Sequence, residues 1–323
     1  MDSSFADAHD GGMSTTTSRA GWTALTAIAP AAWGTTYLVT TQLLPDGHQL
    51  FASLMRTLPA GLVAVLLARS LPRGSWWWKS LALGTLNMGA FFPLLFLAAQ
   101  RLPGGVAATL GAAQPMIVVL LAVAILGERF SPWRALWGAA GMIGVALVVL
   151  GPAAALDPVG VLAGLGGTAS MGIGVVLTKK WGRPPGVSAL GAAGWQLTAA
   201  GLVLLLPALL IDGVPPGLGL PAAAGYLWLG LVGALLAYTL WFSGIRRLPV
   251  TATALLGLLS PLVAAILGAA LADETLAPVQ LAGFAVALAA MLAGQLSPRR
   301  PASEARPSPP RGRMSRGSAA GPR

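Results

Sequence analysis

Cysteine is absent from the sequence, and histidine occurs only at His9 and His48. Without thiols the chain can form neither disulfides nor cysteine-ligated metal sites, and thiol catalysis is excluded. Both histidines lie outside the long apolar segments, so HExxH zinc chemistry and Ser-His-Asp hydrolysis have no histidine to use. A Walker motif is also missing, so ATP is not expected to drive the protein directly. We therefore predict a protein that is not an enzyme and that uses no cofactor or metal.

Charged residues are also scarce, at 9% of the chain against about 25% in soluble domains. Hydrophobic residues make up 55%, and the 42 glycines and 25 prolines lie largely inside long apolar runs, as they do in transmembrane helices. The net charge of +10 comes mainly from short joints and from the tail after Gln295, a distribution that argues against nucleic-acid binding. The sequence therefore predicts a protein whose solvent is the lipid bilayer.

Long apolar runs recur along the whole chain, and a bilayer core requires about 20 apolar residues per helix. The predicted spans are residues 22–43, 49–68, 80–100, 104–126, 135–151, 158–178, 189–210, 222–244, 250–272 and 276–296. Backbone groups in lipid must be satisfied within each segment, so these runs are expected to be helices.

Lysine and arginine are enriched on the cytoplasmic side of membrane proteins. With the N-terminus inside, the inner joints contain Arg69, Arg73, Lys79, Arg129, Arg134, Lys179, Lys180, Arg183, Arg246 and Arg247. The outer joints contain Arg101 and the acids Asp46, Asp157, Asp212, Asp273 and Glu274. This bias predicts a multi-pass protein of the cell (plasma) membrane with both termini cytoplasmic. Residues 1–21 and the basic segment 297–323 are expected to be disordered tails.

One stretch of sequence occurs twice. The string RLPGGVAATLGAAQP begins at Arg101, and RLPVTATALLGLLSP begins 146 positions later at Arg247. At this offset the same residue type recurs, without a gap, for Phe96, Arg101, Leu102, Pro103, Ala108, Leu110, Gly111, Pro115, Leu121, Glu128 and Pro132. At an offset of 140, residues 60–63 (Ala-Gly-Leu-Val) match residues 200–203. The sequence therefore predicts two copies of one five-helix unit, over residues 22–151 and 152–296.

Because five is an odd number, the two copies must cross the membrane in opposite directions. The charges agree, since the predicted orientation places Arg101 outside and its counterpart Arg247 inside. Inverted repeats are typical of secondary transporters, whose halves rock around a site near the middle of the membrane. The predicted fold class is an all-α integral membrane protein with ten transmembrane helices in two inverted five-helix repeats.

Several motifs lie within these helices: Trp33-Gly34-Thr35, Arg56, Leu126-Gly127-Glu128-Arg129, Trp195-Gln196, and the helices that contain Pro115 and Pro261. Together they resemble the drug/metabolite transporter superfamily, in its ten-helix EamA group. The strings WGTTY at 33–37 and FFPLLF at 91–96 are similar to the branch that includes indigoidine (blue pigment) exporters. The second half departs from the pattern with Ala-Asp-Glu at 272–274 in place of Leu-Gly-Glu, but it retains the acid. The resemblance implies export through a cavity lined by the first, third, fourth, sixth, eighth and ninth helices, with the fifth and tenth at the periphery.

Arg56 is the one formal charge inside a predicted span. An arginine at the helix centre costs about 2.5–3.5 kcal/mol on insertion scales. Its role is open between a structural arginine that binds carbonyls or a helix end and a residue of the solute cavity. At the offset of 140 it aligns with Gln196, so both halves carry a polar group at the same depth. This match favours the cavity role.

Glu128 and Glu274 form a second symmetric pair. They are either gating or coupling acids, or they belong to helix caps. We favour the caps, because Ser131 before Pro132 predicts a helix start and an acid is stabilised near the positive helix N-terminus.

The other candidates for the solute path are uncharged. They are Trp33, Thr35, Tyr37, Asn87, Gln114, Ser170, Tyr238, Trp241 and Ser260. A hydrogen bond across helices is the alternative role for each of them. As a set they suit a cavity with aromatic walls and few hydrogen-bonding groups. Pro115 and Pro261 free backbone carbonyls at matching points and are expected to bend their helices.

These observations predict a secondary transporter that moves small organic metabolites, such as amino acids, pigments or other neutral or zwitterionic solutes, by alternating access. The lack of an acid within any predicted span argues against cationic drugs and leaves the coupling ion open. The alternatives are a non-transporting membrane scaffold, a lipid scramblase and, last, an intramembrane enzyme. The expected partners are a small-molecule substrate and the lipid bilayer, not nucleic acid, and the oligomeric state stays open between monomer and homodimer.

Overall fold

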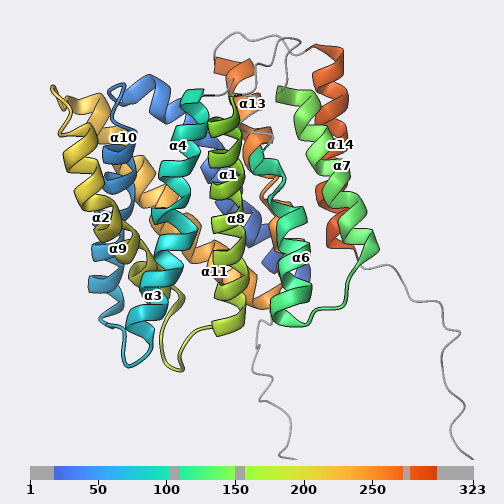
Figure 1. Cartoon of the computed structure of the whole chain (residues 1–323), viewed down its shortest axis with the longest axis horizontal. Helices are drawn as coiled ribbons and strands as arrows, with labels where there is room; N and C mark the ends of the chain where they lie inside the picture. Colours follow the sequence, from blue (N-terminus) through green and yellow to red (C-terminus); the bar gives the residue numbers. More distant parts are fainter. Residues whose placement is uncertain (1–17, 102–109, 150–156, 272–276, 297–323) are drawn as a thin grey trace, which may run out of the picture.

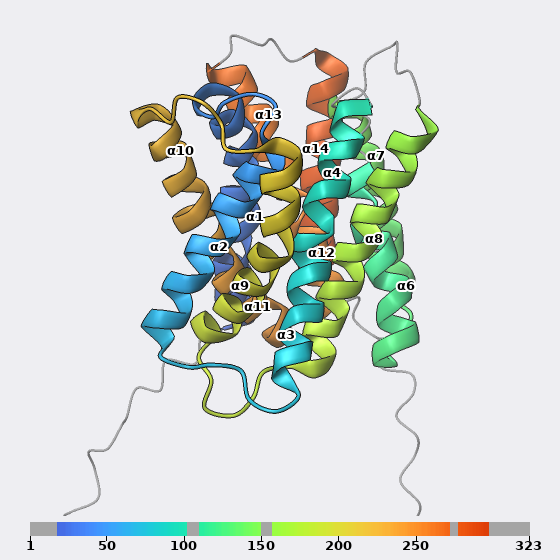
Figure 2. The same cartoon turned by 60° about the vertical axis from the view of Figure 1, so that its left-hand side comes forward.

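The computed structural model is a bundle of helices packed side by side (Figures 1 and 2). It describes residues 18–101, 110–149, 157–271 and 277–296. Every regular element within these ranges is a helix, which confirms the all-α class. Five stretches within them are long and apolar enough to cross a membrane: Gln49–Ala68, Pro158–Trp181, Ala189–Asp212, Leu220–Arg247 and Pro278–Gln295.

The first half of the chain contains α1 (Arg19–Leu43), α2 (Gln49–Ala68), α3 (Trp76–Gly84), η1 (Thr85–Gly89), α4 (Phe91–Arg101), α6 (Gln114–Leu126) and α7 (Pro132–Val149). Ser18 caps α1, because its side chain accepts a hydrogen bond from the Gly21 backbone N–H at 3.2 Å. Residues 19–21, which we assigned to the N-terminal tail, are therefore helical, and that boundary was wrong. The Ser18 cap sets the start of α1, whereas hydropathy detects only where the apolar run begins.

The second half contains α8 (Pro158–Trp181), α9 (Ala189–Pro207), η2 (Ala208–Asp212), α10 (Leu220–Gly230), η3 (Leu231–Leu236), α11 (Ala237–Arg247), α12 (Val250–Leu256), α13 (Leu259–Leu271) and α14 (Pro278–Gln295). α2 occupies the predicted range 49–68, and α8 and α9 begin where the apolar runs begin. Asp157 caps α8 and Ser188 caps α9, each through a hydrogen bond from a glycine backbone N–H.

Among the described residues, three segments have π-helical winding, η1, η2 and η3, and two of them lie at related positions. η1 lies between α3 and α4, and η3 lies between α10 and α11. η1 begins at Thr85 and η3 begins at Leu231, 146 positions later, which is the offset of the repeated string. π segments are rare and occur often at functional sites, because they redirect carbonyl groups from the helix ladder.

Close packing between helices depends on glycines at two crossings. Gly61 of α2 lies against Thr198 of α9, and Gly201 of α9 lies against Leu58 of α2. α7 and α14 form a second pair, in which Gly144 lies against the α14 backbone, and Figure 1 shows this pair at one edge of the bundle. Small residues allow helix backbones to approach closely in membranes.

Contacts at the helix ends show which helices run in opposite directions. Arg101, which ends α4, lies 3.8 Å from the carboxylate of Asp157, which precedes α8. Lys179, near the other end of α8, donates to the backbone carbonyls of Arg246 (3.1 Å) and Leu248 (2.9 Å) at the end of α11. α4 and α11 therefore end at opposite ends of the bundle.

The two ends of the bundle differ in charge. At the end where α11 finishes, Arg247 lies 3.9 Å above the Trp22 ring, and Lys79 lies over several indole rings, including that of Trp181. Burial, and then the positive charges at 246 and 247, lower the pKa of the nearby Arg183 guanidinium. Arg19 of α1 donates to the Gln295 carbonyl of α14 at 3.0 Å, so the start of α1 meets the end of α14.

The bundle has an apolar exterior. Leu66, Leu210 and Leu220 are 73%, 81% and 85% exposed, whereas Arg56 and Asn87 are 7% and 1% exposed. Large exposed apolar surfaces mark contact with lipid or with other proteins. Together with the apolar stretches above, this surface indicates a multi-pass membrane protein.

Candidate functional site

Arg56 of α2 is nearly fully buried. Its Nη2 donates a hydrogen bond to the Gly233 carbonyl of η3 at 3.0 Å. The guanidinium lies close to Gly233, where an ideal Cβ would be 3.5 Å from Nη2, and its Cζ lies 5.1 Å from the centre of the Phe92 ring. A cation over a desolvated aromatic face gains about 2 kcal/mol or more. These contacts hold the buried charge between α2, α4 and η3.

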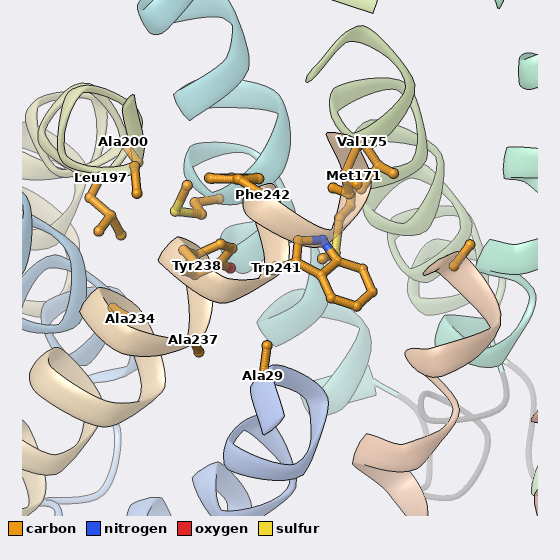
Figure 3. Close-up of a cluster of buried hydrophobic side chains, with 14 of the residues drawn as sticks. Ala29, Met171, Val175, Leu197, Ala200, Ala234, Ala237, Tyr238, Trp241 and Phe242 are labelled. Carbon is orange, nitrogen blue, oxygen red and sulfur yellow. The ribbon is translucent and has the colours of Figure 1, made fainter. Parts of the chain in front are cut away.

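Trp33 of α1 binds the same carbonyl group. Its Nε1 donates to the Gly233 oxygen at 2.9 Å, and its ring lies 5.1 Å from the rings of Tyr238 and Trp241. Figure 3 shows both α11 side chains directed into the buried cluster, with Trp241 beside Met171 of α8. Trp241 is 1% exposed, and its Nε1 has no hydrogen-bond partner within the described part of the chain. The Gly233 carbonyl of η3 thus joins α1 and α2.

A second buried polar group surrounds η1, the π segment of the first half. Asn87 of η1 donates from Nδ2 to Gln196 Oε1 at 3.0 Å and to Thr178 Oγ1 at 3.3 Å. Ser170 of α8 donates to the Leu86 carbonyl of η1 at 2.9 Å. Asn87 and Gln196 are each less than 5% exposed, so these bonds form out of contact with water.

The two polar groups are equivalent under the sequence offsets. Asn87 plus 146 is Gly233, and Arg56 plus 140 is Gln196, so each group joins the second helix of one half to a π segment of the other. The glycines that precede η1 and η3 are related by the same offset of 146 and make matching contacts. Gly84 lies against the Gln196 carbonyl, and Gly230 lies near the Arg56 carbonyl.

Thr35 lies away from this centre. Its hydroxyl accepts a hydrogen bond from Trp228 Nε1 at 2.8 Å and donates to the Ala32 carbonyl at 2.7 Å. Trp228 is 43% exposed, so Thr35 is directed toward the periphery at α10. Tyr37 belongs to α1, but its side chain is outside the described part of the structure.

Gln114 and Ser260 lie at matching places in the two halves, near the starts of α6 and α13. Both are half-buried, and Gln114 Nε2 is buried without a partner among the described residues. The Ser260 carbonyl lies close to Gly34 of α1. No described hydrogen bond or ring contact joins either residue to the Arg56 group.

The helices of Pro115 and Pro261 are interrupted just before each proline. The helical ladder restarts at Ala113, whose carbonyl accepts from the Met116 N–H at 3.0 Å, and α12 and α13 are separated at residues 257–258. A proline lacks the N–H that would bind the carbonyl four residues earlier, Gly111 for Pro115 and Gly257 for Pro261, and its ring crowds that carbonyl, so an interruption in the turn before each proline has a physical cause.

Glu128 lies in the joint between α6 and α7. Gly127 ends α6 in the left-handed conformation, with φ of 65°, and Ser131 Oγ accepts from the Arg134 N–H at 3.4 Å as the cap of α7. This geometry matches the helix start predicted at Ser131. Glu274 falls outside the described residues.

Sequence reasoning missed three participants in the core: Phe92, Thr178 and Gly233. Nothing in a single sequence marks a phenylalanine as the partner of a cation or a threonine as an amide acceptor. Gly233 did have a signal, because it aligns with Asn87 at the offset of the repeated string.

A family model of known proteins matches the chain twice. The model describes the EamA-like transporter family, and it matches residues 21–150 and 158–293. The chain belongs to the EamA-like transporter family. This places it in the drug/metabolite transporter superfamily that its motifs resemble.

Individual relatives agree with the family. Protein PecM of Dickeya dadantii is 45% identical over 264 residues, which cover 82% of this chain and 89% of PecM. The uncharacterized transporter YwfM of Bacillus subtilis is 29% identical, over 84% of this chain and 93% of its own. A probable terminal-alkyne amino-acid exporter of Streptantibioticus cattleyicolor is 29% identical over 65% of this chain and 70% of its own.

A solved crystal structure has the same fold, with a TM-score of 0.71 at 20% sequence identity over 86% of this chain and 96% of that one. As an EamA-like protein the chain is a membrane transporter and not an enzyme. The prediction of a transporter is thereby confirmed in this general form.

Proposed function

We propose that this EamA-like protein is a secondary transporter that exports small organic solutes across the cytoplasmic membrane by alternating access. Its two moving parts are inverted five-helix halves, residues 22–151 and 152–296. The observation that carries the proposal is the pair of matched contacts in the core, Arg56 with Gly233 and Gln196 with Asn87.

The matched contacts support the inverted repeat because each crosses from one half to the other. A twofold relation between the halves requires that a contact from α2 to η3 be repeated from α9 to η1, and both exist. The same relation connects the contact of Gly61 with Thr198 to the contact of Gly201 with Leu58. The opposite directions of α4 and α11 support the inversion.

The matched contacts also suit alternating access. If the halves rock about the crossing of α2 and α9, the bonds between α2 and η3 and between α9 and η1 lie where the halves meet. Opening toward one side would then stretch one contact while the other stays closed. The π segments lie inside helices that must bend during this motion, and π-bulges are recognised sites of helix kinks.

The distribution of charge supports an orientation with the basic end inside. Arg183, Arg247 and Lys79 lie at the end of the bundle where α11 finishes, whereas Arg101 is at the opposite end with Asp157. By the positive-inside rule, this orientation has the basic end of the bundle, with the start of α1 and the end of α14, on the cytoplasmic side.

The composition of the core supports a proposal for the substrate class. Indole and phenol rings of Trp33, Tyr238 and Trp241 adjoin a few amide and guanidinium groups. This mixture suits a small organic solute with one apolar part, such as an amino acid. The amino-acid exporter named among the relatives supports both this class and the direction of export.

The test is uptake into proteoliposomes of radiolabelled amino acids and aromatic metabolites, with and without a pH gradient. We expect accumulation of at least one solute by the wild type and its loss in Arg56→Ala and Gln196→Ala. Arg101→Gln is the matched control, because Arg101 is a half-exposed arginine at the bundle end. A folded protein that moves no solute, with activity unchanged by these substitutions, would favour a scaffold or a lipid scramblase.

A further inference from the structure

Arg56 is a buried cation without a counterion among the described residues. The acids in the described part of the chain, Asp46, Glu128, Asp157 and Asp212, lie at helix ends or in joints, and none is within salt-bridge distance of Arg56. An ionised group in a low-dielectric interior is strongly destabilised unless an opposite charge or several hydrogen bonds compensate it. One backbone carbonyl and the face of Phe92 compensate the charge of Arg56 only in part.

The guanidinium also retains an unused donor. Arg56 Nε is buried and has no hydrogen-bond partner among the described residues, whereas Nη2 donates to the Gly233 carbonyl. Nε and one Nη form the edge of the guanidinium that binds both oxygens of a carboxylate. Gly233 and Phe92 lie beside the guanidinium. Because Nε has no partner among the described residues, the edge formed by Nε and Nη2 is the part of Arg56 from which we derive a ligand contact.

A second unused donor belongs to the same cluster. Trp241 Nε1 is buried without a partner among the described residues, and the Trp241 ring lies 5.1 Å from the Trp33 ring. Trp33 shares the Gly233 carbonyl with Arg56. Arg56 Nε and Trp241 Nε1 are thus two buried donors without an acceptor among the described residues, and unpaired buried donors suit an anionic ligand group.

We propose that the solute carries a carboxylate and that this carboxylate binds Arg56 in exchange for the Gly233 carbonyl. The proposal rests on the proposed function and narrows its substrates to carboxylic acids, including amino acids. The bond from Arg56 to Gly233 closes α2 on η3 in the empty protein. The carboxylate accepts hydrogen bonds from both Nε and Nη2 of Arg56 and compensates the buried positive charge. The bond from Arg56 to the Gly233 carbonyl is then broken, and η3 is free to move away from α2. Because its repeat counterpart, Gln196, is uncharged, the site has only one anion-binding end.

The experiment compares three matched pairs of acid and primary amide: L-phenylalanine with L-phenylalaninamide, L-leucine with L-leucinamide, and phenylacetate with phenylacetamide. Binding to the purified full chain in detergent is measured by isothermal calorimetry and by the shift of the thermal unfolding midpoint. We expect at least one acid to bind roughly 10- to 150-fold more tightly than its amide, the range that corresponds to a hydrogen bond to a charged group. Arg56→Gln should bind acid and amide equally, and Arg101→Gln should behave as the wild type.

Arg56→Lys is included in case Arg56→Gln does not fold. It retains the charge but loses the paired donors, so we expect reduced preference for the acid without loss of the protein. Equal affinity for acids and amides in the wild type, or an undiminished preference in both Arg56 variants, overturns the proposal.

The outcomes separate this proposal from the proposed function. Uptake of a non-acidic solute by a protein that binds none of the acids refutes the carboxylate site and leaves the transporter intact. Acid binding that depends on Arg56 without uptake of any solute supports the site and refutes transport. The absence of both binding and uptake contradicts both.

Discussion

The crossing of α2 and α9 gives a prediction whose size follows from the structure. An ideal Cβ at Gly61 would lie 2.6 Å from Thr198 Oγ1, and one at Gly201 would lie 2.5 Å from Leu58 Cβ. Carbon atoms in contact are about 3.5–4.0 Å apart. Gly61→Ala therefore forces the two helices apart by about 1 Å. The contact includes backbone atoms of α9, which cannot move aside by a change of side-chain rotamer.

We expect Gly61→Ala to destabilise the protein by about 1–3 kcal/mol, the usual cost of overpacking, less the helix-propensity gain of alanine over glycine. Gly201→Ala should have a similar effect. The double variant should cost less than the sum of the single ones, because the first alanine has already separated the helices at the shared crossing.

Unfolding of the purified protein in detergent, followed as the half-life of the folded form at a fixed elevated temperature, measures this effect. Gly111→Ala is the control, since an ideal Cβ there meets nothing within 4 Å and alanine is the better helix former. The control should match or exceed the wild type. If Gly61→Ala is as long-lived as Gly111→Ala, the close crossing is refuted.

Three further predictions concern single hydrogen-bonded groups and use the same unfolding assay. Asp212→Ala should destabilise by about 0.5–2 kcal/mol, because Asp212 accepts from the Leu50 and Phe51 N–H groups and caps α2; no change would show that the cap is dispensable. Asn87→Ala should cost about 1–3 kcal/mol, because it leaves Gln196 buried without its donor, and wild-type stability would count against that bond. Trp33→Phe retains a ring but removes the N–H to the Gly233 carbonyl, so a loss of about 1 kcal/mol is expected, and unaltered unfolding would contradict it.

Hydropathy predicted helix boundaries well where the apolar run and the helix cap coincide. α2 begins and ends at the predicted residues, and α8 extends only three residues beyond the predicted 158–178. At the starts of these helices the apolar run begins next to the cap, Asp212 at α2 and Asp157 at α8, so hydropathy and capping give the same boundary. The start of α1 was misplaced because the Ser18 cap, a polar feature, extends the helix beyond its apolar run.

The internal winding of the helices could not be predicted in this way. η3 contains only apolar residues and η1 adds Thr85 and Asn87, so composition does not mark either as a π segment. What the two segments share is that helices of the other half pack against them, α8 and α9 against η1 and α2 against η3. The sequence predicted that Pro115 and Pro261 bend their helices, and the structure has an interruption shortly before each of them. Proline carries this signal because its ring and its missing N–H disturb its own helix.

The candidate site was predictable in its polar residues and not in their partners. Arg56 and Gln196 were marked by the cost of polarity in lipid and by their alignment at the offset of 140. The acceptor of Arg56, however, is a backbone carbonyl, which every residue possesses. Thr35 was grouped with the core on its residue type, yet its hydroxyl accepts from Trp228 at the periphery. Side-chain direction within a helix decides such cases, and it depends on tertiary packing.

The topology of the two halves is the most direct test of the account, and the absence of cysteine makes it simple to perform. Single cysteines at Arg101 and Arg247 are labelled in cells with a membrane-impermeant maleimide, before and after permeabilisation. The account predicts that position 101 reacts in intact cells and that position 247 reacts only after permeabilisation. Reaction of both positions from the same side of the membrane would contradict it.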